Sequence, residues 1–332
     1  MSDALDMLAT FVAALALDAD GTIRLAGESV GRLAGPREDR PALATALTSI
    51  VYEHGYARAF PTAAADSGGP EDFTAALARA NAGRARDEAG WRSAGLDAGG
   101  GVTATRHGHT RRFAPGQFVA ADGEFPIKPG TPLTVHIPVG SKVAQPGFYY
   151  CFGEASREIN DLSPTVRFYW NVTRAGAERL VRTLTALLNR YRVPFEFKIA
   201  VRSQDYVRRD NAVLYIAQDL FPAVITLLTA AWPALADLLD DDVPLFAKCV
   251  APGLGFAEDP GNGESFGMAR SRLVASALAA AHEDQGFAPT RFEAELASGI
   301  EEAGLRLDAL WRNPGADDIY VFPSLTPERA AV

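Results

Sequence analysis

The sequence predicts an α+β protein: an N-terminal helical region packed on a mixed, largely antiparallel sheet with flanking helices. Apolar residues recur at helical spacing in the N-terminal part of the chain. Farther along, two segments alternate large apolar and polar residues, which indicates half-buried strands. Pro-Gly pairs at 115–116, 129–130 and 146–147 separate shorter apolar runs, as turns between strands do.

Composition limits the classes of function. The 332 residues suggest one large domain or two smaller ones, and the net charge of -9 argues against a generally basic nucleic-acid binder. The two cysteines, Cys151 and Cys249, form no Cys-x-x-Cys motif, so we expect no zinc site and no disulfide framework. The N-terminus lacks a basic signal region, and the apolar run Met7–Leu17 is too short to span a bilayer. We expect a soluble cytoplasmic protein that does not bind membranes.

The N-terminal part carries three amphipathic segments that predict helices: Ala4–Leu17, Pro41–Tyr56 and Pro70–Gly83. Between the last two helices, Thr62–Gly69 is small and polar, which predicts a surface loop. The segment Gly83–Gly101 is rich in glycine, alanine and charge, and is the expected boundary between two parts. We therefore expect a helical region over residues 1–100, a candidate for peptide docking, and an α+β domain over residues 101–332.

Short strands are predicted next, at Val102–Arg106, Gln117–Ala121, Leu133–Val139 and Gly147–Phe152. In the third, His136 falls on the polar face opposite Leu133 and Val135. Glu154–Pro164 is expected to be a connector.

The middle of the chain has the strongest pattern. Apolar and polar residues alternate along 166–172 and again along 195–202. Between them, Arg174–Arg192 has an apolar stripe and predicts an amphipathic helix, which makes a strand–helix–strand crossover. A third strand is expected at Ala212–Ile216.

The C-terminal part is expected to be mainly helical. Asp219–Asp240 predicts helix, with Pro222 in a first turn and Pro233 at a break. Further elements follow in order: a strand at Leu245–Val250, a loop with four glycines at Pro252–Glu264, a helix capped by Ser265 from Phe266 to about His282, and a last helix at Arg291–Leu305.

Cations gather on the polar side of the central strands. If the two strands share a sheet, Arg167, Tyr169 and Lys198 lie on one surface, near Arg208 and Arg209. A lysine on a strand is normally solvated. Nearby positive charge and partial burial would lower its pKa from ~10.4, and a neutral lysine is a usable base.

Several residues have two readings. Tyr169 is either a core aromatic residue or a catalytic acid. Arg270 and Arg272 either decorate a helix or hold an anion near its glycine-rich entry. The pair His107 and His109 could bind a metal, but without a third ligand nearby an exposed basic loop is the better interpretation.

Five short motifs are specific as a set: Gly147-Phe-Tyr-Tyr-Cys-Phe-Gly153, Val166-Arg-Phe-Tyr-Trp-Asn171, Phe197-Lys198, Arg209-Asp-Asn-Ala-Val-Leu-Tyr215, and Glu264-Ser-Phe-Gly267 followed by Arg270. Together they resemble the HopA-type effector family, over most of the chain. That family includes lyase components of ribosomal peptide pathways, similar to the LanY proteins of class V lanthipeptide clusters and their relatives in thioamitide clusters.

This resemblance implies phosphate elimination by residues 101–332. A separate kinase would phosphorylate Ser or Thr of a precursor peptide, and the lyase would leave dehydroalanine or dehydrobutyrine, without metal or cofactor. A cyclase could then act on the product. The central strands are also distantly similar to phosphothreonine lyases of enteric bacterial effectors, whose Lys-Phe-His strand falls on Arg167-Phe168-Tyr169 and whose Lys-Trp-Lys strand falls on Glu196-Phe197-Lys198.

Roles follow from this similarity. Lys198 corresponds to the base lysine and would take the α-proton, while Tyr169 stands where the acid histidine is, and Glu196 replaces one phosphate lysine. His136, Tyr149 or Tyr215 could supply the acid proton instead. Phosphate would be held by arginines: Arg167, Arg209 and Arg270, with Arg202 and Arg208. Peptide contacts are expected from Tyr149, Asn171, Asp210, Tyr215, Lys248 and Arg272.

Two other classes of function stay open. The chain could be a noncatalytic module that binds a phosphopeptide or leader peptide, for which the tyrosine at position 169 is the main support. It could also be an effector that acts on host phosphoproteins.

Overall fold

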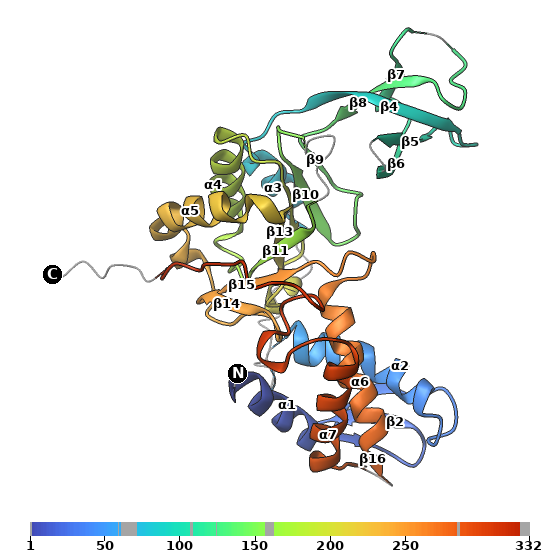
Figure 1. Cartoon of the computed structure of the whole chain (residues 1–332), viewed down its shortest axis with the longest axis vertical. Coiled ribbons are helices and arrows are strands. Elements are labelled where there is room, and N and C mark those ends of the chain that lie inside the picture. The colour runs from blue at the N-terminus through green and yellow to red at the C-terminus, as the bar shows by residue number, and fades with distance from the viewer. Residues whose placement is uncertain are drawn as a thin grey trace, which may run out of the picture.

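The protein, described here as a computed structural model, is an elongated molecule with a sheet at one end, a second sheet in the middle and a helical layer at the other end (Figure 1). The α+β class is confirmed. The structure describes residues 2–58, 60, 72–106, 109–123, 125–156, 163–283 and 286–325. The loop predicted at Thr62–Gly69 and the first histidine of the pair at 107 and 109 lie outside these residues. No helix in the described segments is long and apolar enough to cross a membrane.

Both ends of the chain build the helical layer. Its elements are α1 (Ser2–Ala14), β1 (Leu15–Leu17), β2 (Thr22–Leu25), β3 (Glu28–Arg32), α2 (Arg40–Val51), the π-helical turn η1 (Tyr52–Tyr56), α6 (Phe266–Ala281), β16 (His282–Glu283), β17 (Gly286–Phe287) and α7 (Pro289–Glu302). Helix α6 packs between α2 and α7. Ser265 caps α6 as predicted, since its side chain accepts a hydrogen bond from the Met268 amide at 3.2 Å.

The first helix is shorter than predicted. Leu15–Leu17 was expected to continue it, but these residues form β1 and pair antiparallel with β2. Leu15 and Leu17 are buried in either conformation, so helical spacing alone did not separate the two.

A five-stranded sheet forms the other end of the molecule, in the order β6–β5–β4–β8–β7. Its strands are β4 (Arg86–Leu96), β5 (Val102–Arg106), β6 (His109–Phe113), β7 (Phe118–Ala120) and β8 (Pro132–Ile137). It has its own small core, in which Trp91 packs edge-on against Phe113 at 4.8 Å between ring centroids. The domain boundary expected at residue 100 lies in the turn between β4 and β5, inside this sheet.

The segment Gly83–Gly101, where a boundary between two parts was expected, is largely occupied by strand β4. Register shifts interrupt the pairing of β4 on both sides, between Glu88 and Trp91 and between Ser93 and Leu96. Such bulges break the alternation that would mark the strand in the sequence.

The middle sheet has seven strands in the order β14–β15–β11–β13–β12–β10–β9. They are β9 (Gly140–Ser141), β10 (Phe148–Phe152), β11 (Thr165–Trp170), β12 (Glu196–Ala200), β13 (Ala212–Ala217), β14 (Lys248–Ala251) and β15 (Leu254–Glu258). Neighbouring strands are antiparallel throughout. Strands β11 and β12 therefore run parallel to each other, joined by α4 (Ala177–Arg190) as the crossover predicted, but β13 lies between them.

The two faces of this sheet differ in character. Phe168, Leu214 and Phe197 are paired neighbours on one face, fully buried in the main core with residues of α4 and of α5 (Phe221–Ala231). Phe221 of α5 stacks parallel to Phe168 at 6.0 Å between centroids. As predicted, Pro222 lies in the first turn of α5 and the helix ends before Pro233. Helix α3 (Thr74–Ala80) also packs on α4.

The prediction of a loop over Pro252–Glu264 was wrong in its first half. Leu254–Glu258 forms β15, a buried strand beside β11. Gly253, at φ +71°, makes the tight turn from β14, and a Cβ on Gly255 would come within 3.2 Å of Ala247. The glycines therefore serve a close-packed hairpin rather than an open loop.

Candidate functional site

The polar face of the middle sheet brings the predicted lysine, arginine and tyrosine together. Directly opposed residues of antiparallel strands point to the same face. Lys198, Val213 and Tyr169 form one such row across β12, β13 and β11, and Glu196, Tyr215 and Arg167 form the next. The two alternating segments thus share a sheet, as the sequence pattern required, with β13 as a spacer between them.

Lys198 is partly buried in this face. Its Nζ donates a hydrogen bond to Oε1 of Gln145 at 3.0 Å and lies 4.7 Å from the ring centroid of Phe148. Burial lowers the pKa of Lys198 to about 8, and the charges of Arg167 and Arg208 act in the same direction, against Asp210. With such a pKa, about one lysine in ten is neutral at pH 7.

The side chain of Arg167 is held by a carboxylate and by an aromatic ring. Its Nε and Nη2 donate to Oδ2 of Asp259 at 2.8 and 2.5 Å, and its guanidinium lies 5.3 Å from the ring centroid of Tyr215. Neither bond to Asp259 uses Nη1. The arrangement fixes a nearly buried cation with one nitrogen uncommitted to its carboxylate.

Arg208 links the sheet to the helical layer. It donates from Nε and Nη2 to the two oxygens of Asp210, at 2.9 and 3.0 Å, and from Nη2 to the hydroxyl of Tyr52 at 3.1 Å. Burial and the charge of Asp210 raise the pKa of Tyr52 to about 12. The phenol of Tyr52 is therefore a neutral hydrogen-bond donor or acceptor at the edge of the site.

Tyr169 is 3% exposed, and its hydroxyl lies close to the side chains of Tyr56 and Arg167. Its ring meets Tyr56 edge-on at 6.5 Å and Phe266 at 6.1 Å between centroids. Burial raises the pKa of Tyr169, although the charge of Arg167 opposes this shift. The phenol keeps its proton near neutral pH, the state that a general acid needs.

Two acid candidates lie away from Lys198. His136 is an exposed residue on β8 of the five-stranded sheet and contacts Asp87 at 2.9 Å. Tyr149 is on β10, but it points to the face opposite Lys198, where Asn81 donates to its hydroxyl at 3.3 Å. The structure brings neither residue to the amine. Tyr150, the residue after Tyr149, does lie on the same sheet face as Lys198 and pairs directly opposite it.

The predicted anion ligands on α6 have structural partners. Arg270 is 6% exposed and donates to the backbone carbonyls of Leu310 and Arg312, each at 2.7 Å. Burial lowers the pKa of Arg270 to about 10. Arg272 is exposed and forms an ion pair with Glu264. Neither is among the charges that act on Lys198.

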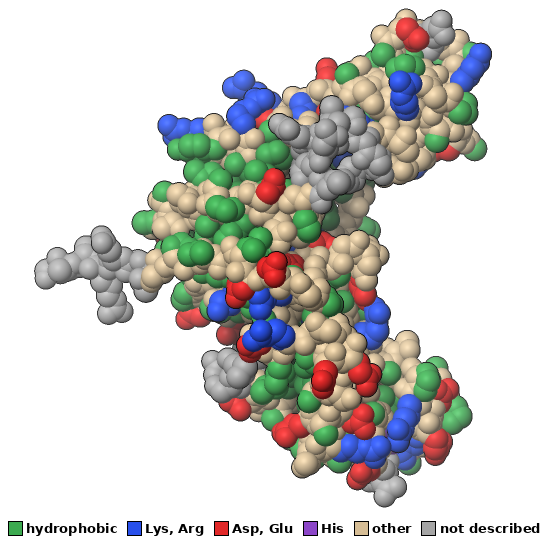
Figure 2. All heavy atoms as spheres, in the orientation of Figure 1, with side chains coloured by type: hydrophobic (Ala, Val, Ile, Leu, Met, Phe, Trp, Pro, Cys, Tyr) green, Lys and Arg blue, Asp and Glu red, His purple; other side chains and the backbone are tan. Residues whose placement is uncertain are grey.

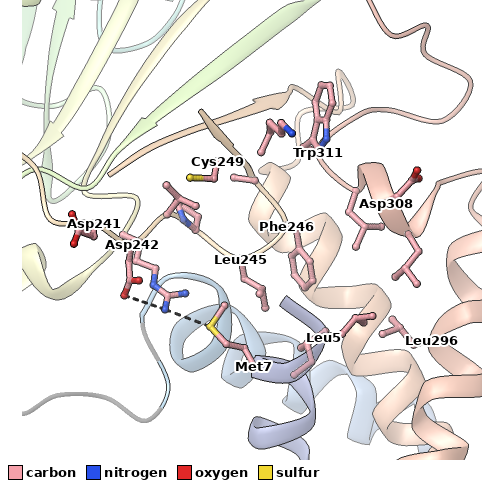
Figure 3. Close-up of a pocket in the computed structure, with 18 residues that line it drawn as sticks. Leu5, Met7, Asp241, Asp242, Leu245, Phe246, Cys249, Leu296, Asp308 and Trp311 are labelled. Carbon is pink, nitrogen blue, oxygen red and sulfur yellow. Dashed lines mark hydrogen bonds and ion pairs between the residues drawn. The ribbon is translucent and has the colours of Figure 1, made fainter. Parts of the chain in front are cut away.

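The remaining predicted residues are spread over other surroundings. Arg202 is exposed at the end of β12. The side-chain amide of Asn171 donates to the backbone carbonyl of Asp242 at 3.0 Å and holds the loop after residue 239. Arg209 and Lys248 line a cavity of about 430 Å³ that does not include Lys198 (Figure 3).

Four residues on or beside the polar face were missed: Tyr52, Gln145, Tyr150 and Asp259. Gln145 accepts hydrogen bonds from both Lys198 Nζ and the Tyr150 hydroxyl, which lies at 2.9 Å. It lies in the turn before β10, and Asp259 just after β15, so no periodicity marks them. Tyr150 alternates with Tyr149 in a predicted strand, and its face could have been assigned had the register been known.

Charge around the molecule is mixed. Basic and acidic side chains are interspersed on the helical layer in the view of Figure 2. Within the described residues, no cluster of three or more His, Cys, Asp and Glu side chains could hold a metal ion.

Comparison with known proteins places this site within a family. No curated protein is similar enough in sequence to count as a relative. Two solved structures of effector proteins are similar, from Pseudomonas syringae pv. tomato strain DC3000 (15% identity, TM-score 0.49, covering 94% of this chain and 97% of that one) and from pv. syringae strain 61 (16%, 0.36, 49% and 62%). The HopA1 effector protein family matches residues 140–312, from β9 to just beyond α7. This match includes the seven strands of the middle sheet and the polar face with Lys198, so the chain belongs to the HopA1 effector protein family.

Proposed function

We propose that the protein is a lyase that eliminates phosphate from phosphoserine or phosphothreonine in a peptide. One observation carries this proposal: a partly buried lysine amine of lowered pKa shares a sheet face with Arg167 and a buried phenol, and the charge of Arg208 also acts on it. β-Elimination needs a base at the α-carbon, an acid at the leaving oxygen and cations for the departing phosphate. The polar face offers one group for each task.

Lys198 in its neutral form takes the α-proton. The electrons of the broken C–H bond form the new C=C bond, and the bond from the β-carbon to the bridging oxygen breaks. Tyr169 donates its proton to that oxygen, and inorganic phosphate leaves. No water attacks and no electron acceptor is consumed, so the balance closes with phosphate and the dehydro residue.

Arg167 and Arg208 hold the phosphate. Each is oriented by a carboxylate, Asp259 or Asp210, and each keeps Nη1 out of that pair. Charge on the departing phosphate is thereby stabilised by guanidinium groups that need no reorganisation. The same charges favour the neutral form of Lys198.

A separate Ser/Thr kinase in the cytoplasm would phosphorylate the peptide, and a cyclase could use the dehydro product. Arg209 and Arg270 are not used in this scheme, because neither is among the charges that act on Lys198. Residues around the polar face, such as Tyr150 and Tyr215, would make the contacts that select the peptide.

The test is incubation of the purified chain with synthetic phosphothreonine and phosphoserine peptides, followed by mass spectrometry. We expect loss of the mass of phosphoric acid. Lys198→Ala should slow elimination by about 100-fold or more, the contribution of a positioned base. The matched control is Lys128→Ala, at an exposed lysine in the loop between β7 and β8, and it should not change the rate. A Lys198→Ala variant as fast as the control would refute the assignment.

A second candidate function is that of a noncatalytic phosphopeptide-binding module. An effector that binds host phosphoproteins could be such a module. It is favoured by the ion pairs of Arg167 and Arg208 with carboxylates of the protein, because an arginine paired in this way can serve a structural role. The same experiment separates the two: binding of the phosphopeptide without any change of mass would support the module.

A further inference from the structure

The cavity lined by Arg209 lies between the first helix, the loop before β14 and the C-terminal segment. Its volume of about 430 Å³ is in the range of small-molecule sites. Figure 3 shows Leu245, Phe246 and Leu5 between Asp242 on one side and Asp308 on the other. The walls are mainly aliphatic and aromatic, with Leu296 of α7 and Trp311 among them.

Arg209 is a polar group in this wall that the protein does not satisfy. It is only 4% exposed, yet Nε and Nη1 have no hydrogen-bond partner in the described structure. Nη2 has only long contacts, 3.4 Å to Asp242 and 3.8 Å to the sulfur of Met7. An unpaired buried N–H costs about 1–3 kcal/mol, so a ligand that accepts these hydrogen bonds recovers that energy.

Backbone strain occurs in the same wall. Phe246, 7% exposed, has a φ of +74°, a conformation that a bulky L residue rarely adopts. Strain of this kind persists where the surrounding structure holds it, and it gathers at binding sites. Phe246 is one of the residues that line the cavity.

We propose that this cavity binds a monoanionic organic acid, a carboxylate with an aliphatic or aromatic body, whose head group Arg209 holds. The apolar walls take the body. The carboxylate replaces Asp242, whose side chain is 60% exposed and can move into water. This site is independent of the lyase chemistry proposed for Lys198.

The rim selects one negative charge rather than two. Asp241, Asp242 and Asp308 line the cavity, against Arg209 and Lys248. A phosphate dianion would meet three carboxylates, whereas a carboxylate meets the same repulsion with half the charge. Its planar pair of oxygens also matches the guanidinium.

Isothermal titration of the full chain with octanoate and with octanol tests the proposal. Octanoate should bind about tenfold more tightly than octanol, because only octanoate can pair with the guanidinium. Leu296→Trp, which fills the cavity, should remove the binding of both. No heat from octanoate, or equal affinity for the alcohol, would overturn the assignment.

Two exposed aspartates provide a matched pair of variants. Asp242→Asn removes the competing carboxylate and should tighten octanoate binding about threefold, as expected for one exposed ion pair. Asp241→Asn removes a neighbouring charge that has no contact with Arg209 and should change the affinity less. Equal effects from both would show a general charge effect and reject the role of Arg209. Arg209→Gln, if folded, should bind octanoate no better than octanol.

Discussion

Arg167 and Arg209 are two arginines with almost the same burial, 8% and 4% exposed, but with very different surroundings. Arg167 has a carboxylate at 2.8 Å or closer through two nitrogens, and Asp259 itself is mostly buried. Arg209 has Asp242 at 3.4 Å, and that carboxylate is largely in water. The first cation is satisfied by the protein, and the second is left with unpaired donors.

The difference teaches what each cation does for the fold. Desolvation costs a guanidinium several kcal/mol, which only a close partner recovers. Where the partner is present, removing it strands a charge. Where a close partner is absent, the buried cation lowers the stability of the fold and can bind an anion from solution. Four substitutions sharpen or break this contrast, in order of expected effect.

Asp259→Ala should lower the free energy of unfolding by about 3 kcal/mol, because it leaves Arg167 buried without its carboxylate. Urea titration measures the loss. The matched control is Asp237→Ala, since Asp237 also pairs with an arginine, Arg179, but both side chains are more than half exposed. The control should lose less than about 1 kcal/mol. Equal losses would erase the contrast.

Arg270→Met should cost about 2 kcal/mol, because the carbonyls of Leu310 and Arg312 lose their donors. Thermal unfolding of the variant reports the change. Two residues on, Arg272 is exposed, so Arg272→Met should stay within about 0.5 kcal/mol of the wild type. A wild-type melting curve for Arg270→Met would show that these bonds do not hold the C-terminal segment.

Lys198→Met should stabilise the protein at pH 7 by about 1 kcal/mol, because it removes a partly buried charge. The folded pKa of about 8 is below the unfolded value, so the charge penalty is full below pH 8. It shrinks as the pH rises through 8 and is gone above about 10.4. Unfolding at pH 7 and pH 10 measures this, with Lys128→Met as the exposed control. A gain that does not depend on pH would contradict the lowered pKa.

Arg209→Met should have the smallest effect, within about 1 kcal/mol of the wild type, because no close partner loses its charge. Urea titration beside Asp259→Ala makes the comparison direct. A loss as large as that of Asp259→Ala would mean that Arg209 is satisfied in solution.

The sequence predicted the polar face because its strands alternate regularly. Arg167 and Tyr169 repeat at two-residue spacing, and Lys198 lies on an alternating strand as well, so one sheet suffices to gather them. The crossover helix between β11 and β12 followed from the same pattern. Predicting this helix does not reveal which strand lies between β11 and β12 in the sheet. The position of β13 depends on strand pairing that no local sequence pattern encodes.

What escaped prediction depends on contacts far apart in the chain. Asp259 is 92 positions from Arg167, and Tyr52 is 156 from Arg208. Arg208 and Arg209 are adjacent in sequence, so they looked like one basic pair. In the fold they part, Arg208 toward Asp210 and Arg209 toward Asp242. The bulged strand β4 and the glycine-containing β15 were missed because their regular pairing depends on tertiary neighbours.

The position of β13 has a consequence for synthesis on the ribosome. Strands β11 and β12 both emerge before β13, the strand that lies between them, and so each first lacks a neighbour on that side. Until Ala217 has left the exit tunnel, each presents an open backbone edge on the side where β13 will pair, and such edges recruit strands from other chains. A nascent chain stalled in this interval would therefore be prone to aggregate, and residues 212–217 supply the strand that covers these two edges.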